Sequence, residues 1–217
     1  MNKDINKYYD TLNLMIPIRY QYIKKIIFKY QNKEIVNAFK SKKVLDLGCG
    51  TGEFLKIFYD MGANCIGIDS FKNFKVKNFK KIRFINEDIY TYLNKNKNYK
   101  FDYIFCFEVI EHLNDKDKFF KLVKKNLKRN GILFISTINK NWLSKKLIID
   151  FAENFFGILP KKTHDYNLFF HTSKLKEACN KNKFKIIDLT GLVYNPLLKN
   201  FNFVNSDLVN YISTIEN

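Results

Sequence analysis

Short apolar segments alternate with longer amphipathic segments from residue 43 to the end of the chain. Each apolar segment is four to seven residues long and is bounded by polar residues, which is typical of a strand. Strands are predicted over residues 44–47, 65–69, 83–86, 101–107, 131–137, 185–190 and 209–214. Apolar residues at helical spacing predict helices over residues 52–61, 116–129 and 173–182. This alternation predicts an α/β fold with an open, mostly parallel sheet, because parallel strands need crossover connections.

The two ends of the chain depart from this alternation. No convincing helix lies between the predicted strands at 185–190 and 209–214, so we expect an antiparallel hairpin at one edge of a seven-stranded sheet. Residues 1–42 are predicted to be helical and either pack on the sheet or form a lid over a ligand. Since no repeat, Gly/Ser linker or composition break divides the chain, we predict a single domain over residues 1–217.

A glycine-rich loop follows the first predicted strand. It carries Gly48, Gly50 and Gly52 at alternate positions, and glycine lets backbone N–H groups approach a ligand without a Cβ in the way. Ligands of open α/β sheets bind beyond the carboxyl ends of the strands, where this loop would lie. The next strand ends in Asp69, whose carboxylate could accept hydrogen bonds from both ribose hydroxyls of an adenosine-containing cofactor. Strand, loop, helix, strand and acid in this order predict a nucleoside-cofactor site.

The glycine spacing argues against two other loops of this kind. A dinucleotide loop needs its third glycine at position 53, which is Glu53 here. A Walker-type phosphate loop needs Gly-Lys-Ser or Gly-Lys-Thr after the glycines, and neither follows.

From Asp46 to Gly52 the loop has the pattern Asp-x-Gly-x-Gly-x-Gly, which resembles the cofactor loop of class I S-adenosylmethionine-dependent methyltransferases. The resemblance implies their Rossmann-like fold and S-adenosyl-L-methionine as methyl donor. It also implies that the loop glycines flank the methionine moiety and that Asp69 holds the ribose. On the same basis, Asp88 with Ile89 brackets the adenine, and Phe107 lies beside the cofactor.

Four further segments narrow the family. They read Cys-Phe-Glu-Val-Ile-Glu-His at 106–112, Ser-Thr-Ile-Asn-Lys-Asn at 136–141, Leu-Pro-Lys-Lys-Thr-His-Asp at 159–165 and Thr-Gly-Leu-Val-Tyr-Asn-Pro at 190–196. Together they closely resemble the bacterial ubiquinone biosynthesis O-methyltransferases, from about residue 16 to the end of the chain. The resemblance implies methylation of catechol hydroxyls in both O-methylation steps of that pathway, on a polyprenylated hydroxyphenol and on 3-demethylubiquinol.

The N-terminal region departs from that family's pattern. The family's cofactor-contacting Arg falls on Arg19, but Ile16 stands where an Asn is usual, and the preceding Trp pair is absent. We therefore expect a shortened lid over residues 1–42. The cofactor-binding residues expected from the two resemblances are Arg19, Asp46, Gly48, Gly50, Gly52, Asp69, Asp88 and Phe107.

Three chemistry-bearing residues follow the fourth predicted strand. Glu108, Glu111 and His112 are spaced i, i+3 and i+4, so a helical turn would put them on one face. Two carboxylates and an imidazole suit a divalent ion such as Mg²⁺, which would stabilise the phenolate of a catechol, and the resemblance to metal-dependent members of the family supports these ligands. The predicted catalytic residues are Glu108, His112 and His164, and without a metal either histidine would act as general base. In the structural alternative both glutamates are solvated and His112 caps a helix.

The formal net charge of +17 raises the question of a polyanionic partner. Only three of the 38 basic residues are Arg, whereas nucleic-acid readers favour Arg, so we expect no nucleic-acid partner. Enrichment in Lys, Asn, Ile and Phe is typical of an AT-rich genome. The alternative is a selected polyanion-binding face, and an RNA methyltransferase is the second functional candidate.

Two other classes of feature are not indicated by the sequence. No run approaches the ~20 apolar residues of a membrane-spanning helix. The four cysteines have no CxxC spacing and are expected to be free thiols.

Residues 140–172 are predicted to form an amphipathic insertion that faces the substrate or a membrane. Leu143, Leu147, Phe151 and Phe155 recur every four residues, with lysine pairs near both ends, which suits an interfacial helix on anionic lipid. Alternatively, this stripe packs on the sheet as a wall of the substrate pocket. Because a polyprenylated catechol or quinol resides in the membrane, we expect a cytoplasmic enzyme, peripheral on the inner face of the cytoplasmic membrane. The resemblance also admits a complex with other enzymes of the ubiquinone pathway.

Overall fold

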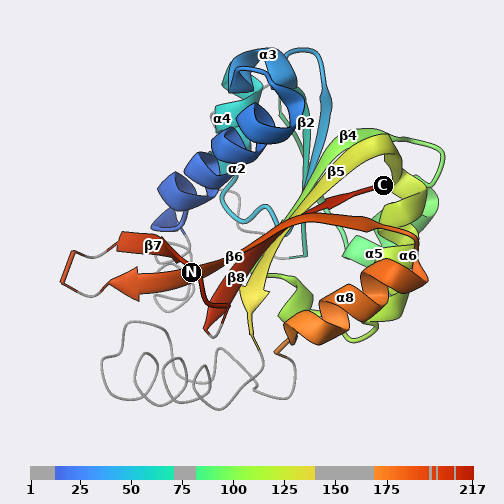
Figure 1. Ribbon diagram of the computed structural model, residues 1–217. Helices are drawn as coiled ribbons and strands as arrows, with labels where there is room; N and C mark the ends of the chain where they lie inside the picture. The colour runs from blue at the N-terminus through green and yellow to red at the C-terminus, as the bar shows by residue number, and fades with distance from the viewer. Residues whose placement is uncertain (1–12, 71–81, 140–168, 196, 199, 208) are drawn as a thin grey trace, which may run out of the picture.

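Eight strands of the described chain form one twisted sheet in the order β3-β2-β1-β4-β5-β8-β6-β7 (Figure 1). The computed structural model describes residues 13–70, 82–139, 169–195, 197–198, 200–207 and 209–217. The strands are β1 Lys43–Leu47, β2 Asn64–Asp69, β3 Arg83–Asn86, β4 Phe101–Phe107, β5 Leu127–Ile138, β6 Lys185–Asn195, β7 Asn200–Val204 and β8 Asn210–Glu216.

The parallel and antiparallel parts of the sheet meet at β5. Strands β1 to β5 are parallel to one another, whereas β8 runs antiparallel between β5 and β6. The predicted mostly parallel sheet and the antiparallel pairing of 185–190 with 209–214 are confirmed. The sheet has eight described strands rather than the expected seven, because β7 pairs with an extended β6. This strand was missed because its five residues alternate Asn with Phe and are too few to give a clear apolar segment.

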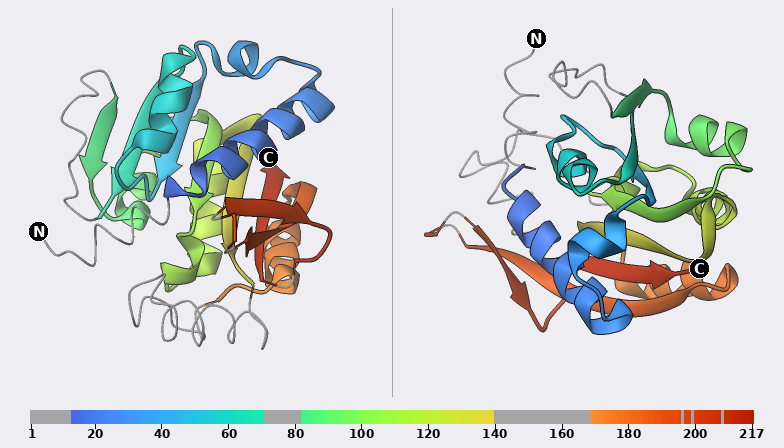
Figure 2. Two further views of the ribbon diagram at one scale, coloured as in Figure 1. Left: turned by 90° about the vertical axis from the view of Figure 1, so that its left-hand side faces the viewer. Right: turned by 90° about the horizontal axis from the view of Figure 1, so that it is seen from above.

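Helices cover both faces of the sheet (Figure 2). One face is covered by α2 Ile16–Gln31, α3 Ile35–Phe39 and α4 Glu53–Asp60, and the other by α5 Ile89–Lys95, α6 Lys116–Asn126 and α8 Thr172–Lys181. Each set buries its own apolar cluster against the strands, which gives three layers. None of the helices in these ranges is long and apolar enough to cross a membrane.

The predicted helices at 52–61, 116–129 and 173–182 correspond to α4, α6 and α8. Two details differ. Helix α5 was not predicted, since its seven residues are too few for a clear periodicity. Residues 127–129, expected at the end of a helix, begin β5 because Leu127 pairs with Phe101 of β4, and this tertiary pairing overrides local helix propensity.

Helix α2, in the expected N-terminal helical region, is attached to the sheet through a buried hydrogen-bond network. The Tyr22 hydroxyl donates to Asp188 Oδ2 of β6 at 2.8 Å and accepts from Thr214 Oγ1 of β8 at 2.9 Å. Thr190 Oγ1 donates to the same carboxylate oxygen at 2.8 Å. Burial raises the pKa of the Tyr22 hydroxyl far above its ordinary value, so it remains a donor. The network fixes the position of α2 over the sheet.

Replacing Tyr22 by Phe should therefore destabilise the fold, because Asp188 and Thr214 lose a buried partner. We expect Tyr22→Phe to lower the free energy of unfolding by about 1–3 kcal/mol in urea denaturation. The matched control is Tyr30→Phe, also on α2, whose exposed hydroxyl donates to the Ile187 carbonyl at 3.1 Å. The control should cost clearly less, and equal losses would contradict this role of the network.

Candidate active site

The glycine loop is fixed to the carboxyl end of β2. All three glycines have a left-handed backbone, with φ of +77° at Gly48, +54° at Gly50 and +81° at Gly52. The Gly48 N–H donates to the Ile68 carbonyl at 2.8 Å, and the Gly50 N–H donates to Asp69 Oδ2 at 2.9 Å. The loop and the acid predicted as its partner are therefore in direct contact.

The same loop packs against the segment that follows β4. A Cβ at Gly48 would lie 2.3 Å from Val109 Cγ2, so no larger residue fits without movement. The loop after β1 and the turn after β4, which are about 60 residues apart in sequence, thus meet at the carboxyl ends of these two central strands.

Arg19 reaches this edge from α2. Its side chain is almost fully buried, and its guanidinium carbon lies 5.0 Å from the centroid of the Phe107 ring. Its Nη2 lies 3.7 Å from Glu108 Oε1 and donates to Met15 Sδ at 3.3 Å. Arg19, Phe107 and Glu108, which the sequence analysis assigned to the cofactor and the chemistry, therefore lie together.

Two buried carboxylates lie at the carboxyl end of β4. Glu108 accepts a short hydrogen bond from Ser136 Oγ, and Glu111 Oε2 accepts from Thr137 Oγ1 at 2.8 Å. Only 1% of Glu111 is exposed, and its Oε1 has no hydrogen-bond partner among the described residues. Burial, reinforced by the charge of Glu108, raises the pKa of Glu111 well above its ordinary value of 4.5. The arrangement favours a proton on Glu111 near neutral pH.

A third buried acid, Asp46, lies at the end of β1. Burial raises its pKa to about 7, the charge of Asp69 adds to this increase, and Arg19 opposes it. Asp46, Asp69, Glu108 and Glu111 are thus arranged at the carboxyl ends of β1, β2 and β4, with Arg19 among them. The candidate site is acidic although the whole chain carries a net charge of +17.

The backbone after β4 does not form the helical turn expected from the spacing of Glu108, Glu111 and His112. Glu108 has a left-handed backbone with φ of +53°, and only Ile110–His112 form a short 3₁₀ turn. As a result Glu111 is buried and His112 is exposed, so the three side chains do not share one face. Across the described ranges, no group of three His, Cys, Asp or Glu residues is arranged to hold a metal ion. The predicted Mg²⁺ ligand set therefore does not fit this geometry.

Two other predicted site residues stand apart from the cluster. Asp88 is exposed and caps the N-terminus of α5, where its Oδ1 accepts from the Thr91 N–H at 2.9 Å and from Thr91 Oγ1 at 3.1 Å. His164 lies outside the described residues, as does the predicted amphipathic insertion up to residue 168.

The comparisons with known proteins agree with this geometry. A family model described as a methyltransferase domain matches residues 20–189. The ubiquinone biosynthesis O-methyltransferase of Pelagibacter ubique is 36% identical over 216 residues, which cover 97% of this chain and 90% of the relative. The chain belongs to the ubiquinone biosynthesis O-methyltransferase family. The member from Bartonella quintana is 34% identical, over 93% of this chain and 84% of its own length.

Solved structures of more distant proteins share the fold of this family member. The plantazolicin methyltransferase BamL superposes with a TM-score of 0.71 at 14% identity, covering 97% of this chain and 88% of its own. Magnesium protoporphyrin IX methyltransferase from Synechocystis superposes with a TM-score of 0.62 at 14% identity, covering 100% of this chain and 88% of its own. These likenesses confirm the class I methyltransferase fold predicted for the chain.

Three residues of this region were not predicted from the sequence. Ser136 and Thr137 bind the two glutamates, and Val109 packs on Gly48. A signal for the first two was present, because two hydroxyl residues end an otherwise apolar strand at the predicted ligand edge. The contact of Val109 had no local signal, since it depends on how two distant loops meet.

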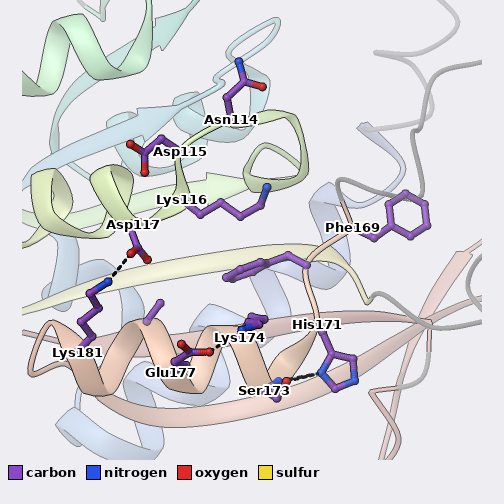
Figure 3. A pocket seen from close by; sticks show the side chains of 12 residues that line it. Asn114, Asp115, Lys116, Asp117, Phe169, His171, Ser173, Lys174, Glu177 and Lys181 are labelled. Carbon is purple, nitrogen blue, oxygen red and sulfur yellow. Dashed lines mark hydrogen bonds and ion pairs between the residues drawn. The ribbon is translucent and has the colours of Figure 1, made fainter.

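A separate groove of about 820 Å³ lies between the start of α6 and helix α8 (Figure 3). Its charged side chains are largely paired, since Lys181 contacts Asp117 and Lys174 lies 2.8 Å from Glu177. His171 at its rim caps α8, where its Nδ1 accepts from the Ser173 N–H at 3.1 Å. None of the cofactor residues predicted from sequence lines this groove. Its lining comes from the start of α6, from α8 and from the residues just before α8.

The contact between Gly48 and Val109 can be tested by a double-mutant cycle. Gly48→Ala should lower the free energy of unfolding in two ways. The left-handed backbone costs about 1–2 kcal/mol for an Ala. Overpacking of the new Cβ against Val109 adds about 1–3 kcal/mol. Adding Val109→Ala removes the clashing methyl, so the double variant should be more stable than the sum of the single losses predicts.

Gly62→Ala is the matched control for the backbone part. Gly62 has φ of +88°, but a Cβ there would lie 3.6 Å from its nearest neighbour atom, Lys40 Cγ. It should cost only the left-handed backbone strain. Additive losses at Gly48 and Val109 would contradict the contact.

The raised pKa of Glu111 predicts a pH dependence of stability. Above about pH 4.5 the unfolded chain releases a proton that folded Glu111 retains, so the free energy of unfolding should fall as pH rises toward the folded pKa. Glu111→Gln cannot ionise, so its stability relative to the unaltered protein should increase from about pH 5 to about pH 8. Urea denaturation at both pH values measures this, and a difference that does not change with pH would contradict it.

Proposed function

We propose that the protein transfers the methyl group of S-adenosylmethionine to a hydroxyl of a polyprenylated catechol or quinol, in both O-methylation steps of ubiquinone biosynthesis. The observation that carries this proposal is the acidic site around Arg19, at the carboxyl ends of β1, β2 and β4. Family membership supports the reaction and the pathway.

The residues at this edge fit S-adenosylmethionine. The cofactor supplies an electrophilic methyl carbon on a positively charged sulfonium, and an acidic surrounding stabilises that charge. Asp69 lies at the end of β2, where a carboxylate can accept from ribose hydroxyls, and Gly50 and Gly52 place no Cβ at their two positions of the loop. The Phe107 ring provides an apolar surface beside them.

Glu108 is the proton acceptor in this proposal. A catechol hydroxyl is a weak nucleophile until its proton is removed, and a positioned carboxylate can accept that proton. Glu108 is less buried than Glu111, and its left-handed backbone, which is unusual for a residue with a Cβ, aims it from the end of β4. As the phenolate oxygen bonds to the methyl carbon, the carbon–sulfur bond breaks, and the proton remains on Glu108. Arg19 and Ser136 hold the Glu108 carboxylate in place.

The proposed route uses no metal ion, because the described positions of Glu108, Glu111 and His112 do not form a ligand set. The acidic site also argues against a nucleic-acid substrate, since phosphates would meet carboxylates there. The prenyl tail of the proposed substrate implies that the protein works at a membrane surface.

Methyl transfer to a short-chain prenylated catechol, read by mass spectrometry with Mg²⁺ and with a chelator, tests the proposal. We expect one added methyl group in both conditions. Absence of product under conditions where the cofactor binds would overturn the proposed substrate class, and RNA would be assayed next. Product that disappears with the chelator would overturn the metal-free route.

Replacing Glu108 by Gln tests the proton acceptor. We expect Glu108→Gln to lower kcat by about 10²-fold or more with a smaller change in KM, since the amide retains the hydrogen bond to Ser136 but cannot take the proton. Glu87→Gln, which breaks a surface ion pair with Lys95, is the matched control and should leave kcat unchanged. A kcat within a few-fold of normal for Glu108→Gln would assign the proton to another residue.

A further inference from the structure

Two leucines at the turn between β6 and β7 are the most exposed large apolar residues of the described chain. Leu197 is 91% exposed and Leu198 is 68% exposed. The β6–β7 hairpin extends beyond the helices that cover the sheet (Figure 1). Exposing two adjacent leucines to water at a projecting tip costs free energy unless another apolar surface covers them.

The turn holds these leucines in a defined conformation. Asn195 Oδ1 accepts from the Leu197 N–H at 3.0 Å and from the Leu198 N–H at 3.2 Å. These two hydrogen bonds fix the backbone at the tip without contributing any cover for the side chains. The tip is therefore preorganised to present apolar groups.

The residues flanking the tip have the composition of a membrane interface. Tyr194 and Phe201 face each other across the hairpin, with ring centroids 5.1 Å apart. Aromatic residues next to an apolar tip are typical of the boundary between lipid headgroups and acyl chains. No Asp or Glu occurs from residue 189 to residue 205, and Lys199 adds a positive charge to the segment.

The turn of the hairpin follows the carboxyl end of β6, and strand direction relates this end to the candidate site. Strand β6 runs antiparallel to β8, which runs antiparallel to β5, so β6 is parallel to β5 and β4. Its carboxyl end, which leads into the turn, therefore points in the same direction as the strand end that carries Glu108. A surface that contacts Leu197 and Leu198 would face the same side as the candidate site.

We propose that the tip of the β6–β7 hairpin inserts Leu197 and Leu198 into an anionic phospholipid bilayer. The choice of side rests on the proposed function, since a prenylated substrate would reach the site from lipid. The net charge of +17 favours an anionic surface over a neutral one, and the exposed leucines add an apolar contribution that charge alone does not supply.

Co-sedimentation with vesicles tests this proposal on the full chain. We compare Leu197→Asn/Leu198→Asn with Val36→Asn. Val36 is 49% exposed on α3, which leads into the amino end of β1, opposite the carboxyl end at which the candidate site lies. On phosphatidylcholine vesicles containing phosphatidylglycerol, the double variant should bind about 10-fold or more weakly, and Val36→Asn should bind normally. Equal binding of all three proteins would overturn the proposal.

A second measurement places the tip in the lipid directly. Both Trp variants are made together with Trp142→Phe, which removes the one native Trp of the chain. The emission of a Trp introduced by Leu197→Trp should shift to shorter wavelength when vesicles are added, and the emission of Val36→Trp should not shift. Equal shifts would overturn the proposal. Sedimentation of the double variant also tests a second copy of this chain as the partner of the tip. If the double variant loses an oligomer and still binds vesicles normally, the membrane proposal is wrong.

Turnover of a soluble catechol separates this proposal from the proposed function. The double variant should retain normal turnover, because neither leucine belongs to the candidate site. If the unaltered protein binds vesicles but does not methylate the catechol, the proposed function is wrong and the proposed membrane contact is retained. Loss of vesicle binding with normal turnover in the double variant supports both.

Discussion

The burial of two carboxylates at the carboxyl end of β4 is the constraint on which the site depends. Removing Glu108 and Glu111 from water costs free energy unless charge or hydrogen bonds compensate. Arg19 and the hydroxyls of Ser136 and Thr137 supply part of that compensation. Burial also raises the pKa of Glu111, which favours a proton on that carboxyl and leaves Glu108 as the acceptor for the substrate proton.

The fold brings the compensating groups to the carboxylates from different elements. Arg19 belongs to α2, which the hydrogen bonds of Tyr22 fix to β6 and β8. Thr214 of β8 in turn pairs with Phe134 of β5, the strand that carries the two hydroxyls near its end. Strand β8, which lies between β5 and β6, thus connects helix α2 to β5, whose hydroxyl residues bind the two glutamates.

The glycine loop and Asp69 were predictable from sequence, because strand, loop, helix, strand and acid follow one another along the chain. The contact between the Gly50 N–H and Asp69 agrees with this order. Arg19 and Phe107 were predicted through family resemblance, and the structure places them together. The metal-ligand geometry was not predictable from spacing, because a left-handed Glu108 and a 3₁₀ turn replace the assumed helix. The β6–β7 tip also escaped prediction, since the exposure of its leucines depends on an extended β6 that pairs beyond the body of the sheet.

We expect the buried pair to hold a proton on Glu111 at neutral pH. Infrared spectroscopy measures this directly, because a protonated carboxyl group and a carboxylate absorb at separate frequencies. The difference spectrum between the unaltered protein and Glu111→Gln at pH 7 should contain the carbonyl stretch of a protonated carboxyl group. A difference spectrum that contains only carboxylate bands would show that Glu111 is ionised at pH 7.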